Sequence, residues 1–66
     1  MDAKKLGKKI KLARVEQDMT QGQLAELIGS LQKSISGYET GLCLPSLQTL
    51  EKIANGLKKP FAYFLD

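Results

Sequence analysis

The chain has 66 residues, 42% of them hydrophobic, and its 10 basic and 7 acidic residues give a net charge of +3. This length allows a single domain, residues 1–66, with a small core and little room for a deep catalytic pocket. One cysteine and no histidine exclude a disulfide within the monomer and argue against a zinc site, so we expect no metal and no cofactor.

No stretch of the sequence offers the roughly 18 consecutive apolar residues that a membrane span needs. The basic N-terminus is not followed by the apolar stretch of a signal peptide. We therefore expect a cytoplasmic protein with no membrane segment.

A first helix is predicted over residues 3–17. Leu6, Ile10 and Ala13 recur at positions i, i+4 and i+7, which is the stripe of one buried helix face. Asp18 follows at a natural helix end.

The positive charge of the chain is concentrated in this first helix. Residues 1–14 hold six of the ten basic residues and one of the seven acidic ones, a balance of +5, which leaves −2 for the rest. Lys8 and Lys9 are therefore candidates for contacting phosphate. A solvated face that keeps the protein soluble explains the same lysines equally simply.

A second helix is predicted over about 21–28. Thr20 is a good N-cap, and Gln23 follows three residues later, as a capping box requires. Met19 and Leu24 occupy the two positions of a hydrophobic staple.

Four residues around the following turn have a characteristic spacing, at relative positions 1, 5, 9 and 15: Gln21, Ala25, Gly29 and Ile35. The methyl group of Ala25 allows close helix packing, Gly29 can turn the chain with a positive φ, and Ile35 supplies an apolar plug. Gln21 lies in the first turn of its helix, where its amide can reach an anion. The spacing indicates a helix-turn-helix whose second helix is free on one face. An ordinary helical hairpin with a glycine stop is the alternative.

A third helix is predicted over 32–40, and its outward side carries amide, ammonium and hydroxyl groups but no acid: Gln32, Lys33, Ser36, Gly37 and Thr40. A glutamine amide can bond bidentately to adenine, and a lysine can donate to guanine. A solvent-facing side chain without a role is the alternative for Gln32. Glycine inside a helix costs about 1 kcal/mol relative to alanine, so Gly37 either admits another backbone or reflects drift at an exposed position.

Gly41 ends the third helix, and Ser46 is a plausible N-cap for a fourth, whose apolar residues repeat with helical spacing: Leu47, Leu50, Ile53, Ala54 and Leu57. Pro60 fits the first turn of a last short helix, Phe61 to Leu65. Cys43 is a small apolar filler or, alternatively, a redox switch. With no strand pattern in the sequence, the predicted fold class is all-α, a compact bundle of five short helices.

The order of these segments, a basic helix ending in Arg14 followed by MTQGQLAELIG, SISGYETG and LPSLQTLEKIA, resembles a known family. It is similar to the lambda-repressor-like helix-turn-helix DNA-binding domains of the Cro/repressor (XRE-like) type. The likeness extends from about Leu6 to Leu65. It implies a bacterial or phage regulator whose helix 32–40 lies in the major groove of DNA.

The resemblance also implies roles for individual residues. Gln21 would contact a backbone phosphate and brace the start of the recognition helix. Thr40 and the loop that follows it would lie along the DNA backbone. The residues that face the groove would be Gln32, Lys33, Ser36 and Gly37.

Arg14 and Glu39 match a structural ion pair between the first and third helices of relatives. Three departures from the family pattern occur. Gly56 and Lys58 stand where relatives show a helix former and then Gly, and the other two departures concern the recognition helix. Leu31 stands where the residue before the recognition helix is usually Ser or Thr, which would allow the helix start to shift by one residue. Gly37 stands where relatives often carry a base-reading side chain.

The sequence therefore predicts a sequence-specific, repressor-like transcription regulator that binds double-stranded DNA and is not an enzyme. A protein-interaction module with this fold, or the antitoxin of a toxin–antitoxin pair, remains the alternative. No small-molecule effector is evident from the sequence.

One short recognition helix reads only a few base pairs, so we expect a homodimer on a pseudo-palindromic operator. Three of the four aromatic residues fall in the last six positions of the chain. The candidate dimer interface comprises Leu57, Phe61, Tyr63 and Phe64. The alternative is that these aromatic side chains cap the small core.

Overall fold

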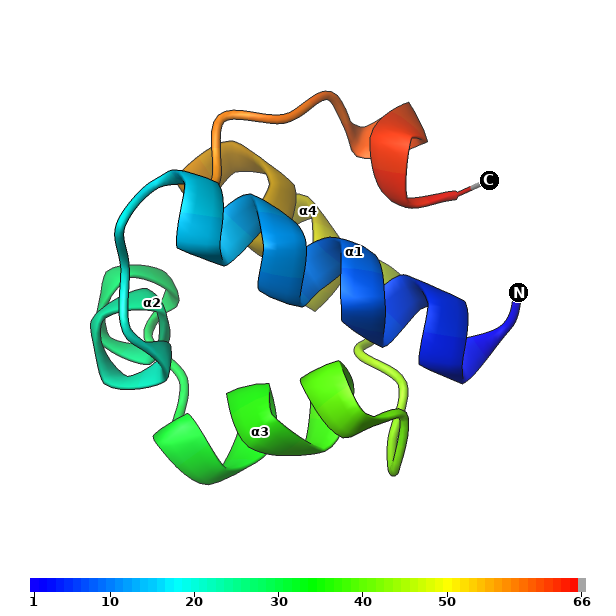
Figure 1. The fold of residues 1–66 in the computed structure, drawn as a ribbon, viewed down its shortest axis with the longest axis horizontal. Coiled ribbons are helices and arrows are strands. Elements are labelled where there is room, and N and C mark those ends of the chain that lie inside the picture. Colours follow the sequence, from blue (N-terminus) through cyan, green and yellow to red (C-terminus); the bar gives the residue numbers. More distant parts are fainter. Residues whose placement is uncertain (66) are drawn as a thin grey trace.

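Residues 1–65 are described by a computed structural model, in which four α-helices and one 3-10 turn pack into a body of 25 × 23 × 20 Å (Figure 1). The elements are α1 (Ala3–Glu16), α2 (Gln21–Ile28), α3 (Gln32–Thr40), α4 (Leu47–Gly56) and η1 (Phe61–Phe64). The all-α prediction is confirmed. The last predicted helix is a 3-10 turn that ends one residue earlier than expected, and α1 also ends one residue early.

The helix ends follow from local hydrogen bonding. The hydroxyl of Thr20 accepts from the backbone N–H of Gln23 at 3.0 Å, and the side-chain oxygen of Gln23 accepts from the Thr20 N–H at 2.8 Å. The predicted capping box is therefore present. Gly29 ends α2 with φ of 70°, the left-handed conformation that glycine adopts without strain.

The core is made of twelve buried apolar residues from every element of the fold: Leu6, Ile10, Ala13, Leu24, Ala25, Ile28, Ile35, Leu50, Ile53, Ala54, Leu57 and Phe64. Leu47, by contrast, is 64% exposed although it belongs to the predicted repeat of the fourth helix. Within residues 1–65, no helix is long and apolar enough to cross a membrane.

The crossing of α1 and α3 is unusually close at Gly7. A Cβ atom there would lie 2.5 Å from the carbonyl oxygen of Tyr38 and 2.6 Å from that of Glu39. Gly7 is buried, and the backbone of α3 occupies the space that a side chain would need. The absence of a side chain at Gly7 thus allows α3 to pack directly on α1, with the opposite side of α3 facing away from the body (Figure 1).

Candidate nucleic-acid interface

The structure begins α3 at Gln32, with Leu31 as the N-cap, so the helix start is not shifted. Leu31 makes no side-chain cap and is 70% exposed. A Cβ atom at Gly22 would lie 3.3 Å from Gln32 Oε1, so the Gln32 side chain lies against the start of α2. The first turns of α2 and α3 therefore meet at an exposed amide group.

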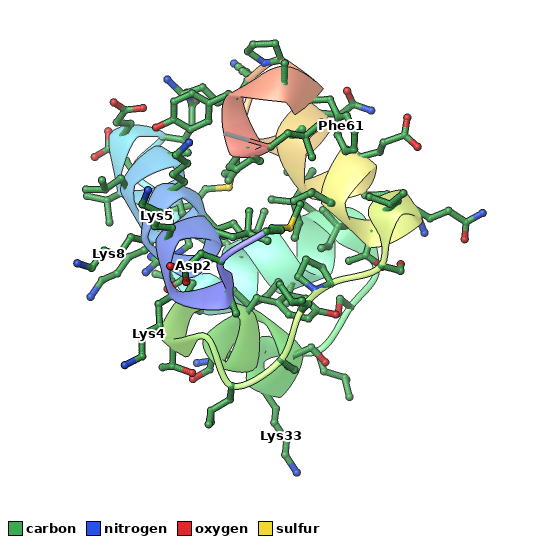
Figure 2. All side chains as sticks on the ribbon, turned by 90° about the vertical axis from the view of Figure 1, so that its right-hand side faces the viewer. Asp2, Lys4, Lys5, Lys8, Lys33 and Phe61 are labelled. Atoms are coloured by element: carbon green, nitrogen blue, oxygen red, sulfur yellow. The ribbon has the colours of Figure 1, made fainter. Side chains whose placement is uncertain are left out.

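The outward side of α3 contains the other predicted contact residues. Lys33 and Thr40 are exposed, and Ser36 and Gly37 are half-buried. Lys33 extends from α3 away from the molecule (Figure 2). The hydroxyl of Thr40 lies within hydrogen-bonding distance of two carbonyl oxygens of its own helix, at 3.0 Å for Ser36 and 3.2 Å for Gly37.

Behind this face, the structure brings Arg14, Glu39 and Gln21 into one network. Arg14 Nε donates to Glu39 Oε2 at 2.6 Å, and Arg14 Nη2 donates to Glu39 Oε1 at 3.1 Å. Gln21 Nε2 donates to the same Oε1 at 3.0 Å. Arg14 Nη1 also donates to the carbonyl oxygen of Met19 at 2.7 Å, which ties the network to the chain leading into α2.

The Glu39 side chain is almost fully buried, and its charge is balanced by the guanidinium of Arg14. The hydrogen bonds from Arg14 to Glu39 raise the pKa of Arg14 above its ordinary value, assisted by their charge attraction and opposed by desolvation. Glu39, the one acid of α3, therefore lies in the interior and not on the outward face of the helix.

The structure separates the two lysines that the sequence placed together. Lys9 Nζ donates to the carbonyl oxygen of Tyr63 at 3.1 Å and lies 5.6 Å from the centre of its ring, so Lys9 faces η1. The prediction of a phosphate contact at Lys9 therefore has no geometric support. Lys8 is exposed and lies on the same side of the molecule as Lys4 (Figure 2).

Lys4 belongs to the basic segment that the sequence predicts as a phosphate contact, although the sequence did not single it out. A Cβ atom at Gly41 would lie 3.0 Å from Lys4 Cγ, so Lys4 sits against the end of α3. The spacing in the sequence already groups it with two other lysines, because Lys4, Lys8 and Lys11 lie at positions i, i+4 and i+7 of one helix face. Lysines of α1 therefore flank α3 on the side where its C-terminus lies.

Gly37 has a packing role that neither sequence interpretation foresaw. A Cβ atom there would lie 2.8 Å from Cys43 Sγ. The carbonyl oxygen of Gly37 also accepts from the backbone N–H groups of Leu42 at 3.0 Å and Cys43 at 3.3 Å. The glycine thus admits a side chain from the following loop, and Leu42 and Cys43 join the outward side of α3.

The predicted dimer interface is wrong for Leu57 and Phe64, which are 0% and 1% exposed and belong to the core. The Tyr63 ring packs edge-on against Phe64 and lies 4.8 Å from Lys59 Nζ. The burial of Leu57 and Phe64 follows from the small size of the domain, because its core has few other large apolar side chains to fill it. Phe61 is half-buried and remains the predicted residue best placed for an intermolecular contact.

This arrangement is that of a helix-turn-helix unit. It combines a tight turn that ends α2, an outward side of α3 and a basic flank on α1. Residues 10–64 match the model of the helix-turn-helix family HTH_3. The chain belongs to this family. Similar solved structures include a restriction-modification controller protein and a transcriptional regulator, which agrees with the regulator, rather than enzyme, predicted from the sequence.

Three relatives illustrate the similarity. The chain is 41% identical over 54 residues to the ImmF control region 10 kDa protein of Bacillus phage phi105, covering 82% of this chain and 60% of that protein. The restriction-modification controller protein C.AhdI from Aeromonas hydrophila has a TM-score of 0.91 at 27% identity, with 96% of both chains covered. PlcR of Bacillus thuringiensis, solved in complex with the peptide PapR7 and DNA, has a TM-score of 0.89 at 41% identity, covering 96% of this chain and 22% of PlcR.

Proposed function

We propose that this protein is a sequence-specific DNA-binding transcription regulator that inserts α3 into the major groove. The observation that carries the proposal is the charge of α3: its one acid, Glu39, is buried against Arg14, and Lys33 extends from the outward side. The outward side of α3 thus offers amide, hydroxyl and ammonium groups to a polyanion such as DNA, and no carboxylate on that side would repel it. The solved complex of PlcR with DNA supports the proposal through a relative of the same fold.

In this proposal, Gln32 and Lys33 read base edges, and Ser36 lies one turn further along the groove. One N–H of the Gln21 amide is used by Glu39. The amide group carries a second N–H, which is available for a backbone phosphate. Arg14 positions this group through Glu39 and makes no DNA contact itself.

The proposal is tested by selecting binding sites from random DNA duplexes and titrating the winner with salt. A protein that makes about 6–10 phosphate contacts loses roughly 10³–10⁵ in affinity between 50 and 200 mM salt. We expect one preferred sequence and a steep salt dependence. Absence of duplex binding at low salt would instead support the protein-interaction module, and co-purification of a second protein would support the antitoxin.

The lysines of α1 provide a prediction with an internal control. Lys4→Ala and Lys8→Ala should weaken binding to all duplexes alike, and each should lower the slope of log affinity against log salt by about 1. Lys9→Ala should leave that slope unchanged, because Lys9 faces Tyr63. Fluorescence anisotropy over a salt series measures the slopes, and a slope lowered equally by all three changes would contradict the assignment.

We further propose that the protein acts as a homodimer on a pseudo-palindromic operator. Half-sites one helical turn apart are separated by about 34 Å. The longest extent of the body is 25 Å, so two copies can occupy these half-sites without overlapping. Since Leu57 and Phe64 are buried, the proposed seam uses Phe61 and the 44% exposed Leu65.

The dimer is tested with the double substitution Phe61→Ser and Leu65→Ser. We expect a folded monomer, measured by sedimentation equilibrium and circular dichroism, whose operator binding is at least tenfold weaker, a change of about 1.4 kcal/mol. Leu12→Ser, at a residue that is 60% exposed on α1, is the matched control and should leave the dimer intact. A double variant that remains dimeric would place the seam elsewhere.

A further inference from the structure

An open hollow lies on the outward side of α3, between the helix and the loop that follows it. Its lining residues come from both segments: Lys33, Ser34, Ser36, Gly37, Leu42 and Cys43. The sulfur of Cys43 lies over Gly37, in the space that a side chain there would need, and together with the side chain of Leu42 it forms an apolar wall. Lys33 contributes a positive charge at the rim.

The wall is held in position by backbone hydrogen bonds. The N–H groups of Leu42 and Cys43 both donate to the carbonyl oxygen of Gly37. Gly41, with φ of 82°, turns the chain sharply enough to bring these two residues back over the helix. The hollow is therefore formed before any ligand arrives, and binding does not require the loop to be ordered first.

Leu42 is 86% exposed, more than any other large hydrophobic side chain among residues 1–65. An apolar side chain on a surface that meets base edges has one natural partner, because the apolar group that base pairs present in the major groove is the C5-methyl of thymine. No carboxylate lines the hollow, and the ammonium of Lys33 at its rim favours a polyanion over an apolar protein segment.

We propose that this hollow receives the C5-methyl group of a thymine in each half-site, so that Gly37, Leu42 and Cys43 read one T·A pair by apolar contact. The inference rests on the proposed DNA-binding function. It gives the loop after α3 a part in base reading, at the place where Gly37 has no side chain of its own.

The experiment replaces each thymine of the selected operator in turn by deoxyuridine, which keeps the base pair and removes only the methyl group. We expect one position per half-site at which the substitution weakens binding about four-fold, the effect of transferring one methyl group out of an apolar contact. In Leu42→Asn and in Cys43→Ser, the same deoxyuridine substitution should have less than two-fold effect, because the apolar wall is already lost.

Leu27→Asn is the matched control, since Leu27 is 56% exposed on α2 and lines a different hollow with residues of α4. It should retain the full deoxyuridine effect, and circular dichroism should show all three variants folded. The inference is overturned if no thymine position responds to deoxyuridine, or if the response persists unchanged in both wall variants. Failure of the proposed function looks different, because selection would then return no preferred duplex at all.

Discussion

Arg14→Met is expected to remove about 3–5 kcal/mol of folding free energy, because it leaves the carboxylate of Glu39 buried without its cation. The Glu39 side chain is 3% exposed and that of Arg14 is 11% exposed, so water cannot replace the lost partner. A domain of this size has a total stability of roughly 3–10 kcal/mol. We therefore expect the variant to lose about a third or more of its stability, measured as a lower urea midpoint in titrations followed by circular dichroism.

Two comparisons separate this effect from a general cost of losing a salt bridge. Lys59→Met breaks the pair between Lys59 and Glu16, which is 3.1 Å long but partly exposed, and should cost less than about 1 kcal/mol. The double variant Arg14→Met with Glu39→Leu removes both charges and should recover most of the stability. Equal losses for Arg14→Met and Lys59→Met would show that the buried pair does not have the assigned role.

Gly7→Ala is expected to destabilise the protein by about 1–3 kcal/mol and to weaken operator binding as well. The new methyl group would lie 2.5 Å from the carbonyl oxygen of Tyr38, and backbone atoms cannot rotate out of its way. To relieve the clash, α3 must move away from α1. Thermal unfolding and duplex binding are the two measurements, and both should change in the same variant.

The control for this prediction is Gly22→Ala, at a second helical glycine. Its methyl group would have the flexible end of the Gln32 side chain as its nearest neighbour, at 3.3 Å, and the Thr20 hydroxyl at 3.9 Å. Since alanine is favoured over glycine inside a helix by up to about 1 kcal/mol, this variant should be as stable as the parent or more so. A gain in stability for Gly7→Ala would contradict the close crossing of α1 and α3.

These two sites act on the same contact. Gly7 lets the backbone of α3 approach α1 at Tyr38 and Glu39, and Arg14, two turns further along the same face of α1, binds the Glu39 side chain. Gln21 joins α2 to the same carboxylate. The orientation of α3, the helix that we propose to face DNA, thus depends on residues that we do not expect to touch DNA.

Much of the fold could be predicted because its signals are local. The capping box of Thr20 and Gln23 and the stop at Gly29 involve residues within a few positions of each other, and both lie where the sequence placed them. The start of α3 at Gln32 follows from the helical periodicity around Ile35. The 3-10 form of the last turn was not predicted, because a segment as short as Phe61–Phe64 carries too few residues for a period to be recognised.

The sequence predicted less well which residues lie on the surface, since the exposure of a side chain depends on which elements pack together. Lys8 and Lys9 are neighbours in sequence, but successive helical residues point about 100° apart. The packing of η1 on α1 then directs Lys9 to Tyr63 and leaves Lys8 exposed. In the same way, the sequence alone does not show whether Phe64 and Leu57 are exposed, and the structure places both in the core.

By itself, the sequence determined the helices, their caps, the helix-turn-helix spacing and the basic character of α1, because each depends on periodicity or on hydrogen bonds between near neighbours. Only the tertiary structure decided three further features: the hydrogen bond that joins Gln21 to the Arg14–Glu39 pair, the contact of Lys4 with the end of α3, and the hollow at Gly37. Each of these joins residues from different elements. The first two depend on how closely α1 and α3 approach, and that distance is set at Gly7 by the fit of one backbone against another. The hollow depends on the turn at Gly41, which brings the following loop back over α3.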